Sequence, residues 1–100
     1  MTSIIVSTKN IPAGKMTVME KNGKEILIAN VDGKYYAMSN VCTDRGCRLN
    51  AGTLTGALLE CPCHGSTFNV TTGSVVKGPT TRPEPIFPVA VIGDQISITV

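Results

Sequence analysis

The chain has 100 residues, of which 42% are hydrophobic and 16% are charged, and its formal net charge is +2 at pH 7. This length predicts one domain, and a charge this small, scattered without a basic patch, excludes nucleic acid as an expected partner. No apolar stretch approaches the roughly 18 residues that a membrane span needs, and the N-terminus lacks a signal-peptide pattern. We therefore expect a soluble, cytoplasmic domain; the alternative is a soluble fragment of a membrane-associated protein.

The predicted strands are short, are rich in β-branched or apolar residues and end at turn signals. In chain order they cover 3–9, 16–20, 25–30, 35–39, 57–60, 67–70, 74–77, 89–92 and 95–100. Asn22-Gly23 and Asp32-Gly33 each stand between two such strands, and these pairs are strong signals for a β-hairpin. Segment 78–88 carries four prolines and cannot form a central strand. No window shows helical periodicity, so the pattern predicts an all-β sandwich or barrel built from hairpins.

All four cysteines fall between positions 42 and 63. In a chain without a signal peptide, such clustering favours metal binding or redox chemistry over a framework of structural disulfides. The cysteines occupy two loops, 42–47 with the sequence CTDRGC and 61–66 with the sequence CPCHGS. Thiolates spaced by one or two residues from a nitrogen or oxygen donor let both donors of a loop face one metal centre.

These two loops resemble those of the Rieske [2Fe–2S] family, whose pattern is Cys-x-His, then a gap of about sixteen residues, then Cys-x-x-His. Here sixteen residues separate Asp44 from Cys61, and the departure from the pattern is Asp44 in place of the first histidine. The resemblance implies a Rieske-like antiparallel β-sandwich or barrel with a small cluster-binding subdomain of two loops. It implies one Rieske-type domain over 1–100, cluster-binding loops within 40–66 and a proline loop over 78–88.

The resemblance also implies a ligand set for a [2Fe–2S] cluster. Cys42 and Cys61 would bind one iron, His64 would bind the other, and Asp44 stands where the second nitrogen ligand belongs. Two imidazoles raise the potential of a Rieske centre to about −150 to +300 mV, against about −400 mV for plant-type ferredoxins. An anionic carboxylate at position 44 is therefore expected to lower the potential below that of a site with two histidines.

The same resemblance implies roles for four further residues. Cys47 and Cys63 match a cysteine pair that forms a disulfide between the two cluster loops in cytochrome bc-type relatives. Ser66 matches a serine whose hydroxyl donates to a bridging sulfide, which stabilises the reduced state. Phe68 stands where relatives of high potential have a tyrosine that donates to a cysteine sulfur, so that hydrogen bond is expected to be absent.

Several alternatives stay open at this point. The fold could have lost its cluster and serve as a binding or structural module, or Cys42, Asp44, Cys61 and His64 could hold a mononuclear zinc ion. Asp44 and Ser66 could be ordinary loop residues, and one cysteine of the 47/63 pair could replace the missing ligand.

The preferred hypothesis is a one-electron carrier, not an enzyme, that serves a partner oxidase, reductase or oxygenase. Arg45 and Arg48 lie beside or within the first loop. They are interpreted as solvated charges that could steer an acidic partner toward this end of the protein.

Overall fold

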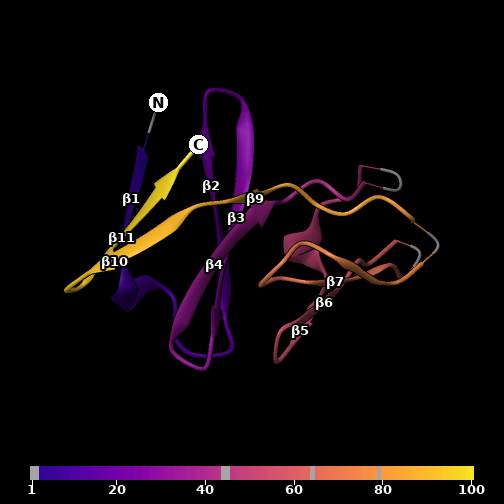
Figure 1. Cartoon of the computed structure of the whole chain (residues 1–100), viewed down its shortest axis with the longest axis horizontal. Coiled ribbons are helices and arrows are strands. Elements are labelled where there is room, and N and C mark those ends of the chain that lie inside the picture. The colour runs from indigo at the N-terminus through magenta and orange to yellow at the C-terminus, as the bar shows by residue number, and fades with distance from the viewer. Residues whose placement is uncertain (1–2, 44–45, 64, 79) are drawn as a thin grey trace.

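The computed structural model describes residues 3–43, 46–63, 65–78 and 80–100. Within these ranges the chain forms three antiparallel sheets, with strand orders β1-β11-β10, β2-β3-β4-β9 and β5-β6-β7-β8. Figure 1 shows the sheets following one another along the long axis of the molecule, with the sheet that contains β5, β6 and β7 at the end opposite β1. The all-β fold class predicted from the sequence is confirmed.

The elements have the following bounds. The strands are β1 Ser3–Ser7, β2 Met16–Lys21, β3 Lys24–Val31, β4 Lys34–Ser39, β5 Thr53–Thr55, β6 Leu58–Glu60, β7 Thr67–Asn69, β8 Val75–Lys77, β9 Ile86–Phe87, β10 Val89–Ile92 and β11 Gln95–Thr99. Two 3₁₀ helices, η1 Thr8–Asn10 and η2 Leu49–Ala51, lie in the connections. No helix in the described ranges is long and apolar enough to cross a membrane.

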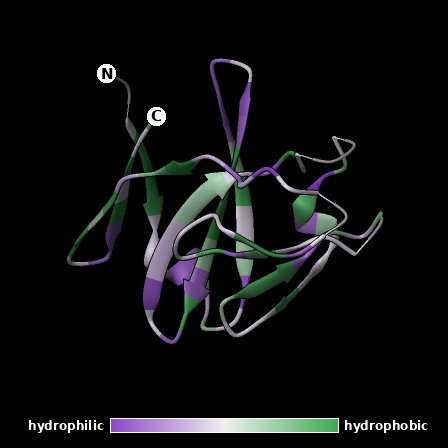
Figure 2. Cartoon of the chain, turned by 45° about the vertical axis from the view of Figure 1, so that its right-hand side comes forward, coloured by the Kyte–Doolittle hydropathy of each residue, from purple (hydrophilic) through white to green (hydrophobic). Residues whose placement is uncertain are grey.

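The two hairpins of the central sheet form where the sequence predicts them. Asn22 and Gly23 join β2 to β3, Asp32 and Gly33 join β3 to β4, and all four residues have positive φ angles. Positive φ at both central residues is the geometry of a type I′ turn, whose twist matches that of the flanking strands. The hairpin around residues 20–25 projects from the molecule and is hydrophilic, as its purple colour shows in Figure 2.

Strand β3 is the centre of the fold because it is buried on both faces. Ile26 and Ile28 pack in one hydrophobic core with residues of β1 and β11, while Leu27 and Ala29 pack in a second core with residues from the cysteine loops and their strands. The sequence of a strand covered on both faces is a continuous apolar run, without the alternation of apolar and polar residues that a half-exposed strand shows. The second core is the one that supports the candidate site.

The structure differs from the sequence prediction mainly between positions 40 and 56. The loop predicted there contains η2 and β5, and Leu49 of η2 is fully buried. Both elements are too short to give a periodic signal, and β5 forms because it pairs with β6. Strand β9 falls within the proline-rich segment, but it has only two residues and lies at the edge of the central sheet beside β4. This placement agrees with the prediction that 78–88 supplies no central strand.

Candidate iron–sulfur site

The two cysteine loops have the same backbone frame. In the first, the Cys42 N–H donates to the Cys47 carbonyl oxygen at 2.8 Å, and the Gly46 N–H donates to the Cys42 carbonyl oxygen at 3.0 Å. In the second, the Cys61 N–H donates to the Ser66 carbonyl oxygen at 2.7 Å, and the Gly65 N–H donates to the Cys61 carbonyl oxygen at 3.2 Å. In each loop, the first cysteine is thus hydrogen-bonded to the residue five positions later through its N–H and to the residue four positions later through its carbonyl oxygen.

A glycine closes each of these frames. Gly46 has a φ of 70° and Gly65 a φ of 78°, in the left-handed region that costs other residues roughly 1–2 kcal/mol. The frame therefore requires glycine four residues after Cys42 and four residues after Cys61. This requirement explains a feature of both sequences, CTDRGC and CPCHGS, that the donor spacing alone does not.

The two cysteines that begin the loops are buried in one core. Cys42 and Cys61 are each 3% exposed, and both belong to the hydrophobic cluster that contains Leu49, Leu59 and Phe68. Neither takes part in the disulfide. The sequence predicted that two loop sulfurs would converge, and the structure places both side chains in a shared apolar environment instead of in separate ones.

A disulfide joins the two loops. Cys47 and Cys63 are bonded; their Cα atoms are 6.4 Å apart, and the two residues are sixteen positions apart in sequence. The disulfide implied by the family resemblance is therefore present. It also removes the alternative that one of this pair replaces the missing ligand, because a metal ligand must be a thiolate.

The proline-rich segment packs over both loops. Ser66 is fully buried, and its Oγ accepts a 3.2 Å hydrogen bond from the Thr80 N–H. That bond leaves the hydroxyl hydrogen of Ser66 for another acceptor, so its predicted role as a donor to a sulfide stays a prediction. The Thr80 hydroxyl in turn bonds the Thr43 hydroxyl at 2.8 Å. One residue of the proline-rich segment thus contacts both cysteine loops.

Glu84 is a site residue that the sequence analysis missed. Its side chain is buried, and its Oε2 accepts a 2.8 Å hydrogen bond from the Thr43 N–H. Burial raises the pKa of Glu84 to about 7, and the hydrogen bond from Thr43 opposes this rise. The available signal in the sequence was a charged residue placed between two prolines, Pro83 and Pro85, in the predicted covering loop.

Three residues with predicted roles, Asp44, Arg45 and His64, lie outside the described residues, as does Pro79 of the proline loop. The ligand roles of Asp44 and His64 and the steering role of Arg45 therefore stay predictions. Arg48 is described: its guanidinium is exposed and forms an ion pair with Glu25 at 2.8 Å. Arg48 is therefore a solvated charge, as predicted, but one that is paired with a carboxylate.

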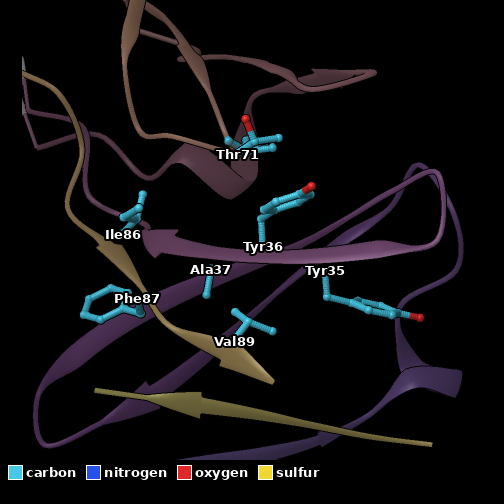
Figure 3. Close-up of a pocket in the computed structure, with 8 residues that line it drawn as sticks. Tyr35, Tyr36, Ala37, Thr71, Ile86, Phe87 and Val89 are labelled. Atoms are coloured by element: carbon cyan, nitrogen blue, oxygen red, sulfur yellow. The ribbon is translucent and has the colours of Figure 1, made fainter. Parts of the chain in front are cut away.

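A small cavity lies apart from the loops, beside β4. It has a volume of about 170 Å³, and Figure 3 shows Tyr36 and Thr71 on the same side of β4. The other residues that line it are Tyr35, Ala37, Val70, Ile86, Phe87 and Val89. None of these is a predicted ligand, so the cavity does not belong to the candidate site.

Comparison with known proteins identifies the family of the chain. A family model described as the Rieske [2Fe–2S] domain matches residues 2–92. The ferredoxin component of the naphthalene 1,2-dioxygenase system of Pseudomonas aeruginosa is 34% identical over 93 residues, which cover 93% of this chain and 89% of that protein.

Two solved structures are similar. The ferredoxin of carbazole 1,9a-dioxygenase from Nocardioides aromaticivorans IC177 has a TM-score of 0.92 at 26% identity, covering 98% of this chain and 97% of that one. A chain of the complex of reduced oxygenase and oxidized ferredoxin in carbazole 1,9a-dioxygenase has a TM-score of 0.91 at 28% identity, covering 96% and 91%.

Two matched loops, each beginning with a buried cysteine and joined by a disulfide, together with the match to a Rieske domain model and the ferredoxin relatives, indicate an iron–sulfur protein of the electron-transfer class. The chain belongs to the Rieske [2Fe–2S] domain family. Its cofactor is a [2Fe–2S] cluster, and it is an electron carrier rather than an enzyme. The described donors fit this cofactor, because two buried thiols on equivalent loops are what one iron of a Rieske cluster requires.

Proposed function

We propose that this chain, acting as one Rieske-type domain over 1–100, is a soluble, cytoplasmic carrier that delivers single electrons to the oxygenase component of a dioxygenase system. The observation that carries the proposal is the pair of equivalent loops with Cys42 and Cys61 in one apolar core. The partner class follows from relatives that are ferredoxin components of dioxygenase systems, and from a structural neighbour in complex with an oxygenase.

We further propose that Cys42 and Cys61 hold one iron as thiolates, while His64 and Asp44 hold the other. The bound cluster supplies reversible one-electron chemistry. Around it, the apolar core that contains Leu49, Leu59 and Phe68 excludes water from the sulfur ligands, and the disulfide keeps the loops together. A low local dielectric strengthens the effect of every nearby charge on the cluster.

The surroundings of the cluster favour a potential below that of a high-potential Rieske centre. The Asp44 carboxylate adds negative charge that a second histidine would not, and this charge opposes reduction. Phe68 is fully buried in the core that contains both cysteines, and it has no hydroxyl to donate to a sulfur. Ser66 acts in the opposite direction if its free hydroxyl hydrogen is donated to a sulfide.

Stoichiometric reduction followed by electron transfer tests this function. The anaerobic protein is titrated with dithionite, and the reduced form is mixed in a stopped-flow instrument with a purified oxygenase component of naphthalene 1,2-dioxygenase. We expect uptake of one electron per chain and bleaching that reverses when the oxygenase is added. A Cys61→Ser variant is the control, because it lacks one proposed iron ligand. Rapid reduction without any transfer to the oxygenase would contradict the proposed partner class.

A further inference from the structure

Thr43 forms hydrogen bonds with three residues of the segment that follows Gly78. Its hydroxyl donates to the Arg82 carbonyl oxygen at 2.7 Å and therefore accepts from the Thr80 hydroxyl at 2.8 Å. Its carbonyl oxygen accepts from Arg82 Nη2 at 2.6 Å, and its N–H donates to Glu84 Oε2 at 2.8 Å. We call Thr80, Arg82 and Glu84 the Thr43 clamp. Every polar atom of Thr43 is bonded to this clamp.

The position of Thr43 makes the clamp relevant to the cluster. Thr43 lies directly between Cys42 and Asp44, two residues proposed as iron ligands. The frame bonds of the first loop involve the backbones of Cys42, Gly46 and Cys47, and none of them involves Thr43. The clamp is therefore the set of contacts in the described structure that fixes the part of the loop between the two proposed ligands.

Glu84 differs from the other clamp residues because it brings a buried carboxyl group. Its backbone is anchored by its own N–H, which donates to the Gly73 carbonyl oxygen at 2.9 Å. Its Oε1 is buried and has no hydrogen-bond partner among the described residues. Leaving a buried polar atom unpaired destabilises the folded state. An alanine or leucine at position 84 would avoid this destabilisation. The presence of a carboxyl group there therefore indicates a functional role.

We propose that Glu84 is a positioning residue for the first cluster loop, acting through the Thr43 N–H, and that its carboxylate lowers the reduction potential of the cluster. This inference rests on one part of the proposed function, namely that the two cysteine loops hold the cluster. A carboxylate accepting from the Thr43 N–H fixes the peptide between the two ligands of the first loop. Its negative charge also disfavours the addition of an electron nearby.

The charges that face Glu84 determine when this effect operates. Arg82, two positions before Glu84, brings a cation to the clamp: its guanidinium is exposed and donates to the Thr43 carbonyl oxygen. The other described contacts of the Glu84 residue are the Thr43 N–H and the Gly73 carbonyl oxygen, which carry no net charge. Because the pKa of Glu84 is raised to about 7, the carboxylate is ionised above that pH and neutral below it.

Potentiometry on Glu84→Gln tests the inference. Glutamine keeps an oxygen that accepts from Thr43 but removes the charge. At about pH 9 we expect the variant to hold a several-fold higher ratio of reduced to oxidised cluster at a fixed potential, where tenfold equals about 59 mV for a one-electron couple. At about pH 5.5 the difference should largely vanish, since both side chains are then neutral. Glu20→Gln, which removes an exposed carboxylate from β2, is the matched control and should leave the potential unchanged at both pH values.

A second variant separates positioning from charge. Glu84→Asp keeps the charge but shortens the side chain by one methylene, so the acceptor withdraws from the Thr43 N–H. We expect a changed spectrum of the reduced cluster in electron paramagnetic resonance, and this variant also serves if the glutamine variant fails to load a cluster. Unchanged potential in Glu84→Gln at about pH 9, or an unchanged spectrum in Glu84→Asp, overturns the inference. A wild-type protein without a [2Fe–2S] spectrum would instead overturn the proposed function, so the two failures are distinguishable.

Discussion

Cys42 and Cys61 hold equivalent positions in two loops that close with the same pair of backbone hydrogen bonds. In this register Asp44 is the counterpart of Cys63, and Arg45 is the counterpart of His64. The bonds that close the first loop come from the backbones of residues 42, 46 and 47. Because these bonds among the described residues use backbone atoms only, we predict that the fold of the first loop tolerates a different side chain at position 44.

A substitution at position 44 is the first test. Asp44→His should fold as the wild-type protein does and should raise the reduction potential, because a neutral imidazole replaces an anionic carboxylate near the iron. The expected value moves toward the range of about −150 to +300 mV that two-histidine centres show. Redox titration followed by visible absorption measures it. Asp44→Asn, which removes the charge without supplying an imidazole, is the matched control, and an unchanged potential in Asp44→His would show that position 44 does not act on the cluster.

The second prediction concerns the glycine that closes the second loop. Gly65→Ala should destabilise the protein by about 1–2 kcal/mol, because alanine is strained at a φ of 78°. It should also lower the yield of cluster, since the frame that carries Cys61 is disturbed. Thermal unfolding and iron content measure the two effects. Gly78→Ala is the control, because the φ of Gly78 lies outside the strained region and the nearest atom to an added Cβ is 3.5 Å away. Equal losses in both variants would contradict the role of the frame.

Removal of the disulfide gives the third prediction. Cys47 and Cys63 are sixteen positions apart, and closing a loop of that length stabilises a protein by about 3 kcal/mol. The double variant Cys47→Ser/Cys63→Ser should therefore unfold at a lower denaturant concentration, and dithiothreitol should lower the stability of the wild-type protein but not of the variant. A wild-type protein that is insensitive to the reductant in this assay would indicate that the disulfide adds no stability.

The fourth prediction follows from the raised pKa of Glu84. The pKa rises from 4.5 in the unfolded chain to about 7 in the folded protein. The folded state thus binds a proton more tightly, so this stabilisation is complete below about pH 4.5 and is lost as the pH rises through about 7. Glu84→Gln does not titrate, and its stability relative to wild type should increase by about 1–2 kcal/mol between about pH 5 and about pH 8, after allowance for solvent screening. If the difference in melting temperature between the wild type and Glu84→Gln stayed constant across this range, the raised pKa of Glu84 would be contradicted.

Local signals in the sequence predicted much of the fold. Asn22-Gly23 and Asp32-Gly33 identified the central hairpins, because the conformation of such turns is encoded in two residues. The repeated cysteine pattern identified the two loops and, through the family resemblance, the disulfide. Each of these features depends on residues that are close in sequence or on a motif with fixed spacing.

The features that the sequence did not reveal depend on contacts between distant segments. Glu84 bonds Thr43 across 41 positions, and no periodicity or motif connects the two. Strand β5 has three residues and forms through its pairing with β6. The ion pair between Arg48 and Glu25 likewise joins segments that are far apart in the chain. Only the folded arrangement brings these groups together, so composition and spacing carry no trace of them.

Electron paramagnetic resonance of the dithionite-reduced protein, combined with iron and acid-labile sulfide analysis, tests most directly whether Cys42 and Cys61 share one cluster. We predict two irons and two sulfides per chain and the signal of a one-electron-reduced [2Fe–2S] centre, in which one ferric and one ferrous iron are magnetically coupled. Both should be lost in Cys42→Ser and in Cys61→Ser. A colourless protein, with zinc in place of iron or with no metal at all, would contradict a shared cluster between the two loops.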